Sequence, residues 1–277
     1  GAIAVPLIVG RALKLKSPDD ALGFEQSLGG TAYEDRGVFF WAARNGSPGA
    51  ASQAEAWQIL SPVRGTFSGV DEINHLVQAR YRGRAREMAL KPKWQRKIPA
   101  PQGTQGILWG DKVINVNNNS RRRTYPEIEN PYVANGDIGI VVGTYKGKNH
   151  KHPPSALEVE FAAQSGVVYK YPDWEFTREE KLPELELAYA LTVHKTQGSQ
   201  FGHTIVVIPT NCRPLSRELL YTALTRHRHE VTLLLEGPVD GLARYGDDTR
   251  SEIARRMTNL FSAPAPVQTS APAAPSP

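Results

Sequence analysis

The chain has 277 residues, of which 40% are hydrophobic and 22% are charged, and its formal net charge is +5. This length suits one large or two small domains with a buried core, and the modest basic excess permits nucleic-acid binding without requiring it. No apolar run approaches the roughly 18 residues that cross a bilayer. The single cysteine, Cys212, cannot form an internal disulfide or a thiolate zinc cluster. We therefore expect a cytoplasmic protein in a reducing compartment that does not bind membranes.

Residues 1–50 carry few clear signals, and we assign them to a partly ordered N-terminal segment. The apolar stretch 1–9 begins with glycine and has no basic residue ahead of it. We interpret it as a buried strand in a piece of a longer protein, and not as a signal peptide. Residues 38–41 follow a turn and indicate a second short buried strand.

A strand, a loop and a helix are predicted between residues 57 and 81. Residues 57–61 form a compact apolar run that ends at a proline, and from residue 70 apolar side chains recur at helical spacing. The loop 61–65, Ser-Pro-Val-Arg-Gly, would lie at the carboxyl end of the strand. Open α/β sheets bind their ligands at that edge.

A change of pattern predicts a β-rich insertion over residues 105–185. Short runs with β character alternate with turn-rich stretches, and helical periodicity is missing. These runs are 112–116, 138–144, 157–161 and 167–171. Short strands at this spacing are typical of a small β-barrel inserted into an α/β unit.

The α/β pattern returns at residue 186. Apolar runs at 187–193, 204–208 and 231–235 predict strands, and residues 215–228 predict an amphipathic helix that Ser216 can cap. This order implies a mostly parallel sheet built from residues 51–104 and 186–261. Residues 262–277 are rich in proline, alanine and serine, so we expect a disordered tail.

One segment has the composition of a phosphate-binding loop. It reads Ala-Tyr-Ala-Leu-Thr-Val-His-Lys-Thr-Gln-Gly-Ser-Gln-Phe over residues 188–201. A buried strand there ends in hydroxyls, a histidine and a lysine, and Gly198 lets the backbone approach a ligand closely. A polar connection without any ligand is about as common for this composition.

A second segment, residues 219–226, reads Leu-Leu-Tyr-Thr-Ala-Leu-Thr-Arg. At helical spacing Thr222, Thr225 and Arg226 share the face opposite the apolar one. A guanidinium on a rigid helix can be aimed across a cleft at a phosphate, which is the arginine-finger arrangement. A solvated arginine on a surface helix is the commoner case by several to one.

Together these segments resemble two motifs of superfamily 1 helicases of the RecD/UvrD kind. Residues 188–201 resemble motif V, T-V-H-K-[ST]-Q-G-x-[EQ]-F, and residues 219–226 resemble motif VI, Y-[TV]-A-[LIV]-T-R. The loop 61–65 looks like the RecD-type segment that opens the second RecA-like domain. Residues 135–139, Asn-Gly-Asp-Ile-Gly, are similar to the SH3-like insertion of RecD-type helicases. The resemblance implies a RecA-like α/β domain interrupted by an SH3-like barrel.

The resemblance also implies roles for single residues. Arg226 would be the catalytic finger that meets the γ-phosphate of ATP, with Gly198 and Gln200 near the nucleotide. The family more often has glutamate where Gln200 stands. The residues that would hold the backbone of single-stranded DNA are Arg64, Thr192, His194, Lys195 and Thr196.

The residues that grip ATP are not found in this sequence. The nearest match to G-x-x-x-x-G-K-[ST] is residues 143–149, which is one residue short and ends in asparagine. No hydrophobic strand ends in an Asp-Glu pair suited to Mg²⁺. ATP and Mg²⁺ would therefore be bound mainly by an N-terminal RecA-like domain outside this chain, as part of a DNA helicase acting in repair or recombination. The alternatives are a nucleic-acid-binding module without ATP hydrolysis and an interaction scaffold with a helicase fold.

Weaker signals carry no assignment. Residues 121–123 and Lys146 are basic, but a solvated basic loop is at least as common as a nucleic-acid contact. The histidine pairs at 150/152 and 227/229 have the spacing of strand-borne metal ligands without the carboxylates or thiols that accompany them. We predict no metal site.

Overall fold

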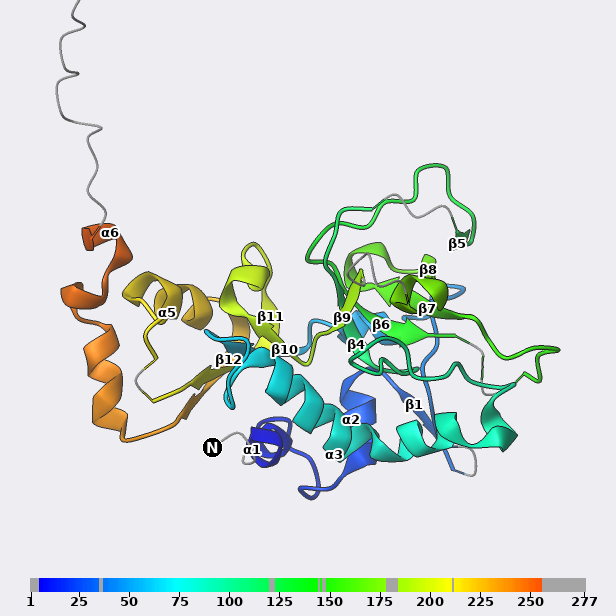
Figure 1. The fold of residues 1–277 in the computed structure, drawn as a ribbon, viewed down its shortest axis with the longest axis horizontal. Helices are drawn as coiled ribbons and strands as arrows, with labels where there is room; N and C mark the ends of the chain where they lie inside the picture. The colour runs from blue at the N-terminus through cyan, green and yellow to red at the C-terminus, as the bar shows by residue number, and fades with distance from the viewer. Residues whose placement is uncertain are drawn as a thin grey trace, which may run out of the picture.

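The computed structural model describes residues 5–34, 37–119, 123–143, 145, 148–177, 184–210 and 212–255. These residues form a four-stranded and a six-stranded sheet that lie side by side, with the long helix α3 (Val70–Leu90) running beneath both (Figure 1), and a separate two-stranded sheet. Within the described ranges, no helix combines the length and the apolar character that a membrane crossing requires. The predicted tail, 262–277, and the basic residues Arg121, Arg122 and Lys146 lie outside the described ranges.

The four-stranded sheet is fully parallel, as the sequence predicts. Its strands, in spatial order, are β10 (Ala190–Thr192), β3 (Trp57–Ser61), β11 (Phe201–Ile208) and β12 (His227–Leu235). Every residue of β3 is buried, as expected for a central strand with helices or a second sheet on its faces. The parallel order confirms the α/β class.

The predicted strand 187–193 is divided between two sheets. Its start belongs to β9 (Leu185–Leu187) in the other sheet, and Val193 already begins the 3₁₀ turn η6 (Val193–Thr196). Between the two strands, the side-chain amide of Gln58 donates to the carbonyls of Ala188 and Tyr189, at 3.0 and 3.1 Å. This tertiary contact fixes the change of direction between the two strands. The apolar periodicity of the sequence does not predict such a contact.

Two helices follow the strands of the parallel sheet. Helix α3 extends nine residues beyond the predicted end at residue 81. Helix α5 (Arg217–Leu224) begins where predicted, because the Ser216 hydroxyl accepts a hydrogen bond from the Leu219 N–H at 3.1 Å. It ends before the predicted residue 228, since the chain turns at Thr225 and enters β12.

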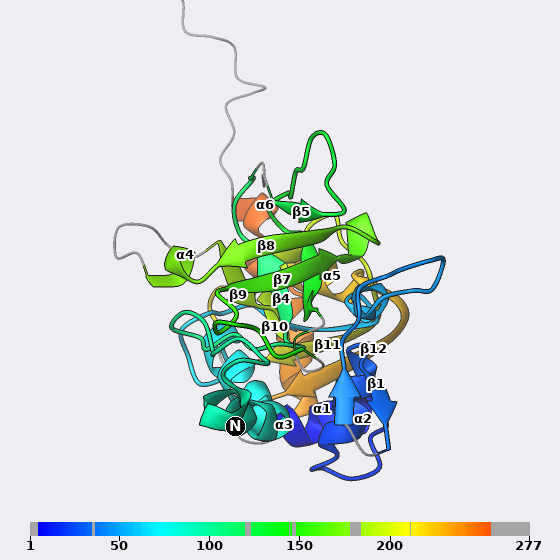
Figure 2. The same ribbon diagram turned by 90° about the vertical axis from the view of Figure 1, so that its right-hand side faces the viewer.

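The predicted β-rich insertion is a six-stranded antiparallel sheet. Its spatial order is β5 (Thr124–Tyr125), β8 (Val168–Pro172), β7 (Ala156–Phe161), β6 (Ile138–Val142), β4 (Lys112–Asn115) and β9. One short helix, α4 (Trp174–Thr177), follows β8. Among the described residues β5 and β9 form the two edges, so closure into a barrel stays a prediction. Figure 2 shows this sheet above the helices α1, α2 and α3.

The N-terminal segment packs on α3. Its elements are α1 (Val5–Ala12), α2 (Ala21–Ser27) and a hairpin of β1 (Thr31–Tyr33) and β2 (Gly37–Phe39). The predicted strand at 38–41 is confirmed in part, since β2 includes residues 38 and 39 and ends there. The predicted strand at 1–9 is wrong in its described part: Val5 and Val9, one helical turn apart, are both buried on α1. The Tyr81 hydroxyl of α3 donates to the Pro6 carbonyl at 2.7 Å and fixes this helix.

A buried ionic network joins α3 to the six-stranded sheet. The Asp111 carboxylate accepts from Arg82 Nε at 3.2 Å, from Gln78 Nε2 at 2.6 Å and from the Tyr189 hydroxyl at 2.8 Å. Arg82 also pairs with Glu25 of α2. Burial raises the pKa of Tyr189 well above its ordinary value, so its hydroxyl stays a donor. The network ties together three segments that lie far apart in the sequence.

A buried lysine lies at the contact between the two sheets. Lys112 begins β4, is fully buried, and donates from Nζ to the Trp57 carbonyl of β3 at 2.5 Å. Its ammonium lies 4.7 Å from the ring centre of Trp57 and 5.9 Å from that of Phe201. Burial lowers the pKa of Lys112 to about 7, because a charge is poorly solvated in an apolar interior.

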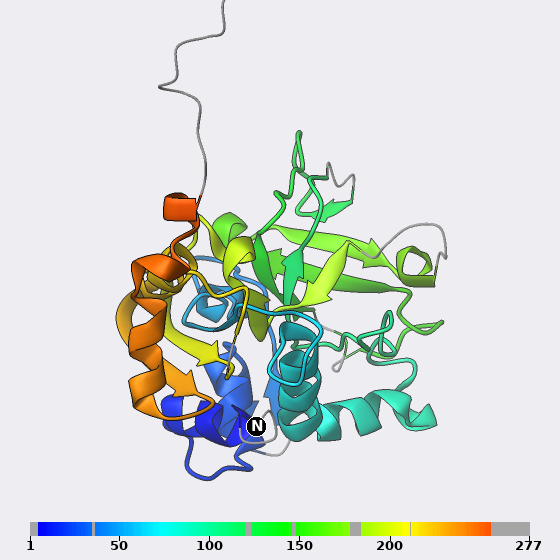
Figure 3. The same cartoon turned by 60° about the vertical axis from the view of Figure 1, so that its left-hand side comes forward.

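The chain after β12 covers the end of the parallel sheet away from the six-stranded sheet (Figure 3). It consists of the 3₁₀ turns η7 (Val239–Tyr245) and η8 (Asp248–Arg250) and the short helix α6 (Glu252–Arg255). The other 3₁₀ turns are η2 (Ala50–Gln53), η3 (Pro92–Trp94) and η5 (Ala162–Gln164).

Candidate nucleic-acid interface

Parallel strands place the predicted functional residues at two opposite edges of one sheet. The segments that follow β3 and β10 leave the sheet at its carboxyl edge, because these strands run in the same direction. Arg64 and Lys195 lie in these two segments. The chain between β10 and β11 then returns to the amino edge, where Arg226 precedes β12. The sequence places these residues on loops, but only the sheet order separates them into two groups.

At the carboxyl edge, Arg64 and Lys195 meet on one carboxylate. Arg64 Nη2 and Lys195 Nζ each lie 3.0 Å from the same oxygen, Oε2 of Glu186. Arg64 Nε also lies 3.3 Å from a carboxylate oxygen of Asp71, in the first turn of α3. Burial lowers the pKa of Arg64, but attraction to Glu186 and Asp71 outweighs this effect and the pKa is raised. We call Arg64, Glu186 and Lys195 the Glu186 cluster.

Sequence reasoning missed Glu186. Glu186 directly precedes the apolar run 187–193, which was predicted as one buried strand. A charged residue next to that run gave no reason to connect Glu186 with Arg64. The residue lies on β9, at the edge of the six-stranded sheet. The inserted sheet therefore contributes a carboxylate to a site whose two cations come from the parallel sheet.

The other predicted DNA contacts differ in their access to solvent. The Thr192 hydroxyl caps η6 by accepting from the Lys195 N–H at 3.4 Å, and His194 is exposed. Thr196 is buried, and its hydroxyl donates to the Val193 carbonyl at 2.8 Å. Because that hydroxyl already serves the turn, the predicted DNA contact by Thr196 does not fit this conformation.

An exposed aromatic side chain lies in the same loop as Arg64. Phe67 is 83% exposed, whereas the next residue, Ser68, is buried. The base of the loop is fixed because the Ser61 hydroxyl donates to the Ser68 carbonyl at 2.8 Å. An exposed aromatic side chain in a loop that also carries a cation suits stacking on unpaired bases. The sequence analysis did not single out Phe67, although an aromatic residue in a Gly-, Ser- and Thr-rich loop was a usable signal.

At the amino edge, Arg226 is held by neutral acceptors. Its guanidinium donates to the carbonyls of Thr222 and Ser199, at 3.0 and 3.2 Å, and to the Thr225 hydroxyl at 3.3 Å. Within the described ranges, no carboxylate lies within 4.0 Å of it. The residue follows the end of α5, and does not lie on the helix face as predicted. It is half-buried, so the cation faces solvent in part.

Gly198 and Gln200 lie in the segment that contacts Arg226. Gly198 has a φ of +88°, a conformation that other residues adopt with strain, and it turns the chain toward β11. The chain is tied here because the Phe201 N–H donates to the Arg226 carbonyl at 2.8 Å. The side chain of Gln200 is exposed. Two residues predicted near a nucleotide, Gly198 and Gln200, are therefore close in the fold to the third, the half-buried Arg226.

The described residues contain no group of three or more histidine, cysteine or acidic side chains placed to hold a metal ion. His227, considered above as half of a metal pair, is 2.6 Å from the Leu224 carbonyl through Nδ1. Cys212 is buried, and burial raises the pKa of its thiol. This environment makes the thiol a poor nucleophile.

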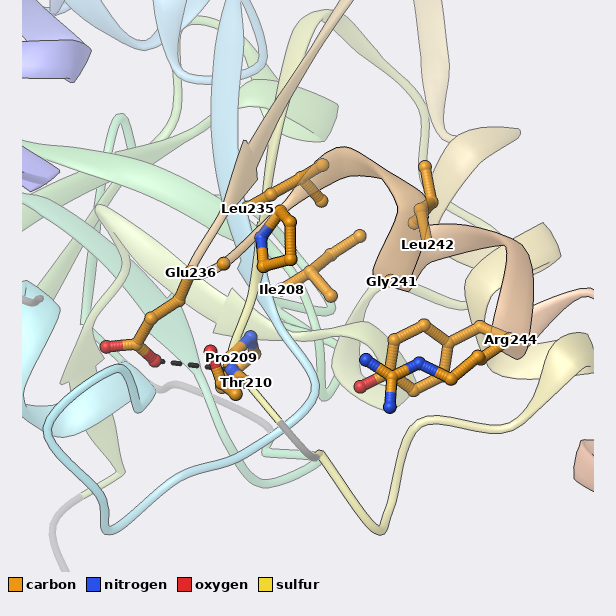
Figure 4. A pocket seen from close by; sticks show the side chains of 11 residues that line it. Ile208, Pro209, Thr210, Leu235, Glu236, Gly241, Leu242 and Arg244 are labelled. Carbon is orange, nitrogen blue, oxygen red and sulfur yellow. Dashed lines mark hydrogen bonds between the residues drawn. The ribbon is translucent and has the colours of Figure 1, made fainter.

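A small pocket opens at the carboxyl ends of β11 and β12 (Figure 4). Its wall is mainly apolar, with Ile208, Leu235 and Leu242 beside the exposed Arg244. The Glu236 carboxylate at its rim accepts from the Ser68 hydroxyl at 3.2 Å and from the Thr210 N–H at 3.4 Å. These bonds link the loop after β3 to the loop after β11. The carboxylate has a structural role in holding the loop that carries Arg64 and Phe67.

Comparison with known families identifies one segment. Residues 187–234 match the model of the UvrD-like helicase C-terminal domain. This segment contains both Lys195 and Arg226, and it runs from the end of β9 almost to the end of β12.

Similar proteins include helicases. The chain is 32% identical over 189 residues to the ATP-dependent RecD2 DNA helicase of Deinococcus radiodurans. This alignment covers 66% of this chain and 20% of that protein. It is 46% identical over 57 residues to the RecBCD enzyme subunit RecD of Haemophilus influenzae, covering 20% of this chain and 9% of that protein. The chain thus spans no more than about a fifth of either relative. A crystal structure of Pif1 helicase from Bacteroides with ADP-AlF3 and ssDNA aligns with a TM-score of 0.34 and 15% identity, over 88% of this chain and 52% of that one.

Proposed function

We propose, from the premise that this chain contains the C-terminal part of a superfamily 1 helicase, that it is the second motor domain of an ATP-dependent DNA helicase. Residues 51–104 and 186–261 would form the RecA-like domain, and residues 105–185 an SH3-like insertion. An N-terminal RecA-like domain would hold ATP and Mg²⁺. The chain would bind single-stranded DNA at the carboxyl edge of its parallel sheet and present Arg226 to the γ-phosphate.

The observation that carries this proposal is the separation of two cationic sites on one rigid sheet. Arg64 and Lys195 are brought to one point at the carboxyl edge from segments 131 residues apart. Arg226 lies at the amino edge with only neutral acceptors. A motor domain needs a DNA contact and a nucleotide contact on one body, so that closure on ATP moves the DNA contact.

The DNA contact would be sequence-independent. Lysine and arginine side chains bind phosphate oxygens, and such binding weakens as salt rises because counterions are released from the nucleic acid. Phe67 would add stacking on bases, which every base allows. The described site offers no arrangement for reading base edges.

The nucleotide contact would use Arg226. A guanidinium held at neutral carbonyls can turn to an anion without first breaking an ion pair. Insertion of such an arginine beside the transferred phosphoryl group stabilises the transition-state charge, and its loss lowers kcat about 10³-fold or more in enzymes of this type. Gly198 and Gln200 would border the same nucleotide.

The first test measures fluorescence anisotropy of a labelled oligo(dT) strand over a salt series. We expect the wild-type chain to bind, and Lys195→Ala to bind more weakly with a salt slope smaller by about 0.7, the value for one phosphate contact on a single strand. Arg226→Ala is the matched control, because it also removes one cation but at the opposite edge. Equal loss in both variants would contradict the placement of DNA at the carboxyl edge.

The second test uses the intact helicase and follows ATP hydrolysis. Arg226→Ala should lose DNA-stimulated hydrolysis while its binding to oligo(dT) stays unchanged. If the intact protein binds DNA but hydrolyses no ATP, and ATP does not change its DNA affinity, the result would instead favour a binding module without ATPase activity. A folded chain that binds no DNA would favour an interaction scaffold.

A further inference from the structure

The Glu186 cluster presents two cations to one anionic oxygen, and we propose that the Glu186 carboxylate occupies the position of a DNA phosphate. In this proposal Glu186 is a built-in competitor that weakens the grip of Arg64 and Lys195 on single-stranded DNA. The inference rests on the proposed DNA-binding function and deepens it.

The geometry supports a shared-anion site. Arg64 Nη2 and Lys195 Nζ lie at equal distances, 3.0 Å, from the same Glu186 oxygen. This is the distance at which an ammonium or guanidinium N–H donates to a phosphate oxygen. A phosphate oxygen placed there would satisfy both cations at once, without moving either.

The three side chains of the Glu186 cluster all reach solvent in part, so a phosphate can approach them. The side chains of Arg64, Lys195 and Glu186 are 48%, 29% and 22% exposed. Water and salt reach such partly exposed charges and screen the attraction between them. The buried pair of Arg82 and Asp111, at 1% and 0% exposure, shows how this chain holds a permanent ion pair.

The anion of the Glu186 cluster is carried by the inserted sheet. Glu186 lies on β9, where it pairs with Ile114 of β4. The two cations follow β3 and β10 of the parallel sheet. The competing anion and the two cations therefore come from different sheets.

A merely structural role makes the opposite prediction. If Glu186 serves to hold Arg64 and Lys195 in position, then removing its charge releases two flexible side chains and weakens DNA binding. If it competes with phosphate, removing its charge strengthens binding. The sign of the change in affinity therefore decides between the two roles.

The test compares wild type with Glu186→Gln, which keeps the shape of the side chain and removes its charge. We expect oligo(dT) to bind about three- to tenfold more tightly to Glu186→Gln at low salt, the range expected when one partly exposed like charge is removed. Asp71→Asn is the matched control, since it makes the same charge change but contacts Arg64 alone. We expect a smaller gain there. Thermal unfolding followed by circular dichroism checks that each variant is folded.

A second experiment tests whether the increase in DNA affinity depends on the Glu186 cluster. In a Lys195→Ala background, Glu186→Gln should increase affinity by less, because one of the two competing cations is gone. Unchanged or weakened binding by folded Glu186→Gln would overturn the inference, even if Lys195→Ala confirms the DNA site. Folded wild type and Glu186→Gln that both fail to bind would overturn the proposed DNA-binding function, and the inference with it.

Discussion

Replacement of the buried Lys112 by methionine should change how the stability of the protein depends on pH. The ammonium is fully buried and contacts the Trp57 carbonyl and two aromatic rings. Within the described residues no carboxylate lies within 4.0 Å of it. Methionine keeps the length and flexibility of the side chain and has no charge to desolvate.

The pKa of Lys112 sets the direction and the size of the effect. Burial lowers it from 10.5 to about 7. Between these values the unfolded chain carries the proton and the folded chain has released it, so unfolding takes up a proton. The free energy of unfolding therefore rises with pH, by about 1.4 kcal/mol for each pH unit. From pH 7 to pH 9 this group alone should add about 2 kcal/mol to stability, because at pH 7 the folded chain still holds about half of the proton. The contribution is lost as pH falls through about 7.

Urea unfolding at intervals from pH 6 to pH 9 would measure this. We expect the difference between the free energies of unfolding of wild type and Lys112→Met to shift toward wild type by about 2 kcal/mol between pH 7 and pH 9. Lys93→Met, at an exposed position, is the control and should follow wild type. Parallel curves for wild type and Lys112→Met would refute the reasoning, since they would mean that Lys112 keeps its proton in the folded chain.

Three further predictions concern stability and binding. Arg82→Ala should lower the free energy of unfolding by about 3–5 kcal/mol in urea, because it leaves the Asp111 carboxylate buried without its cation. The control Arg84→Ala, at an exposed position, should change the free energy of unfolding by less than about 0.5 kcal/mol. Gly198→Ala should cost about 1 kcal/mol in the same assay, because φ is +88° there while the space around a Cβ is open. Phe67→Ala should leave stability within about 0.5 kcal/mol of wild type and weaken oligo(dT) binding about fivefold or more, as expected if one base stacks on the exposed ring; unchanged binding in anisotropy would exclude stacking.

Local patterns in the sequence predicted most of the described elements. The strand at residues 57–61 was predicted with its observed bounds, because a compact apolar run ends there at a helix-breaking and strand-breaking proline. The start of α5 was predicted from Ser216, whose hydroxyl acts within three residues. The parallel sheet followed from the order of strands and helices, since parallel neighbours need a crossover.

Predictions failed where distant contacts decide the conformation. Residues 5–12 form a helix because Val5 and Val9 find a surface on α3, which no local pattern reveals. The apolar run 187–193 divides between two sheets because Gln58 binds the carbonyls at the junction. The DNA contact predicted for Thr196 from its motif stays a prediction, and its hydroxyl donates to the Val193 carbonyl inside η6.

The sequence by itself determined the α/β class, the β-rich insertion and the two motif segments, since spacing, capping and turn chemistry act over a few residues. Only the tertiary structure decided how the candidate site is divided. The sheet order β10-β3-β11-β12 sends Arg64 and Lys195 to one edge and Arg226 to the other. It also places the carboxylate of Glu186, from the inserted sheet, between two cations that are 131 residues apart in the chain. These contacts depend on how the two sheets pack together, and the spacing of residues along the chain does not predict that packing.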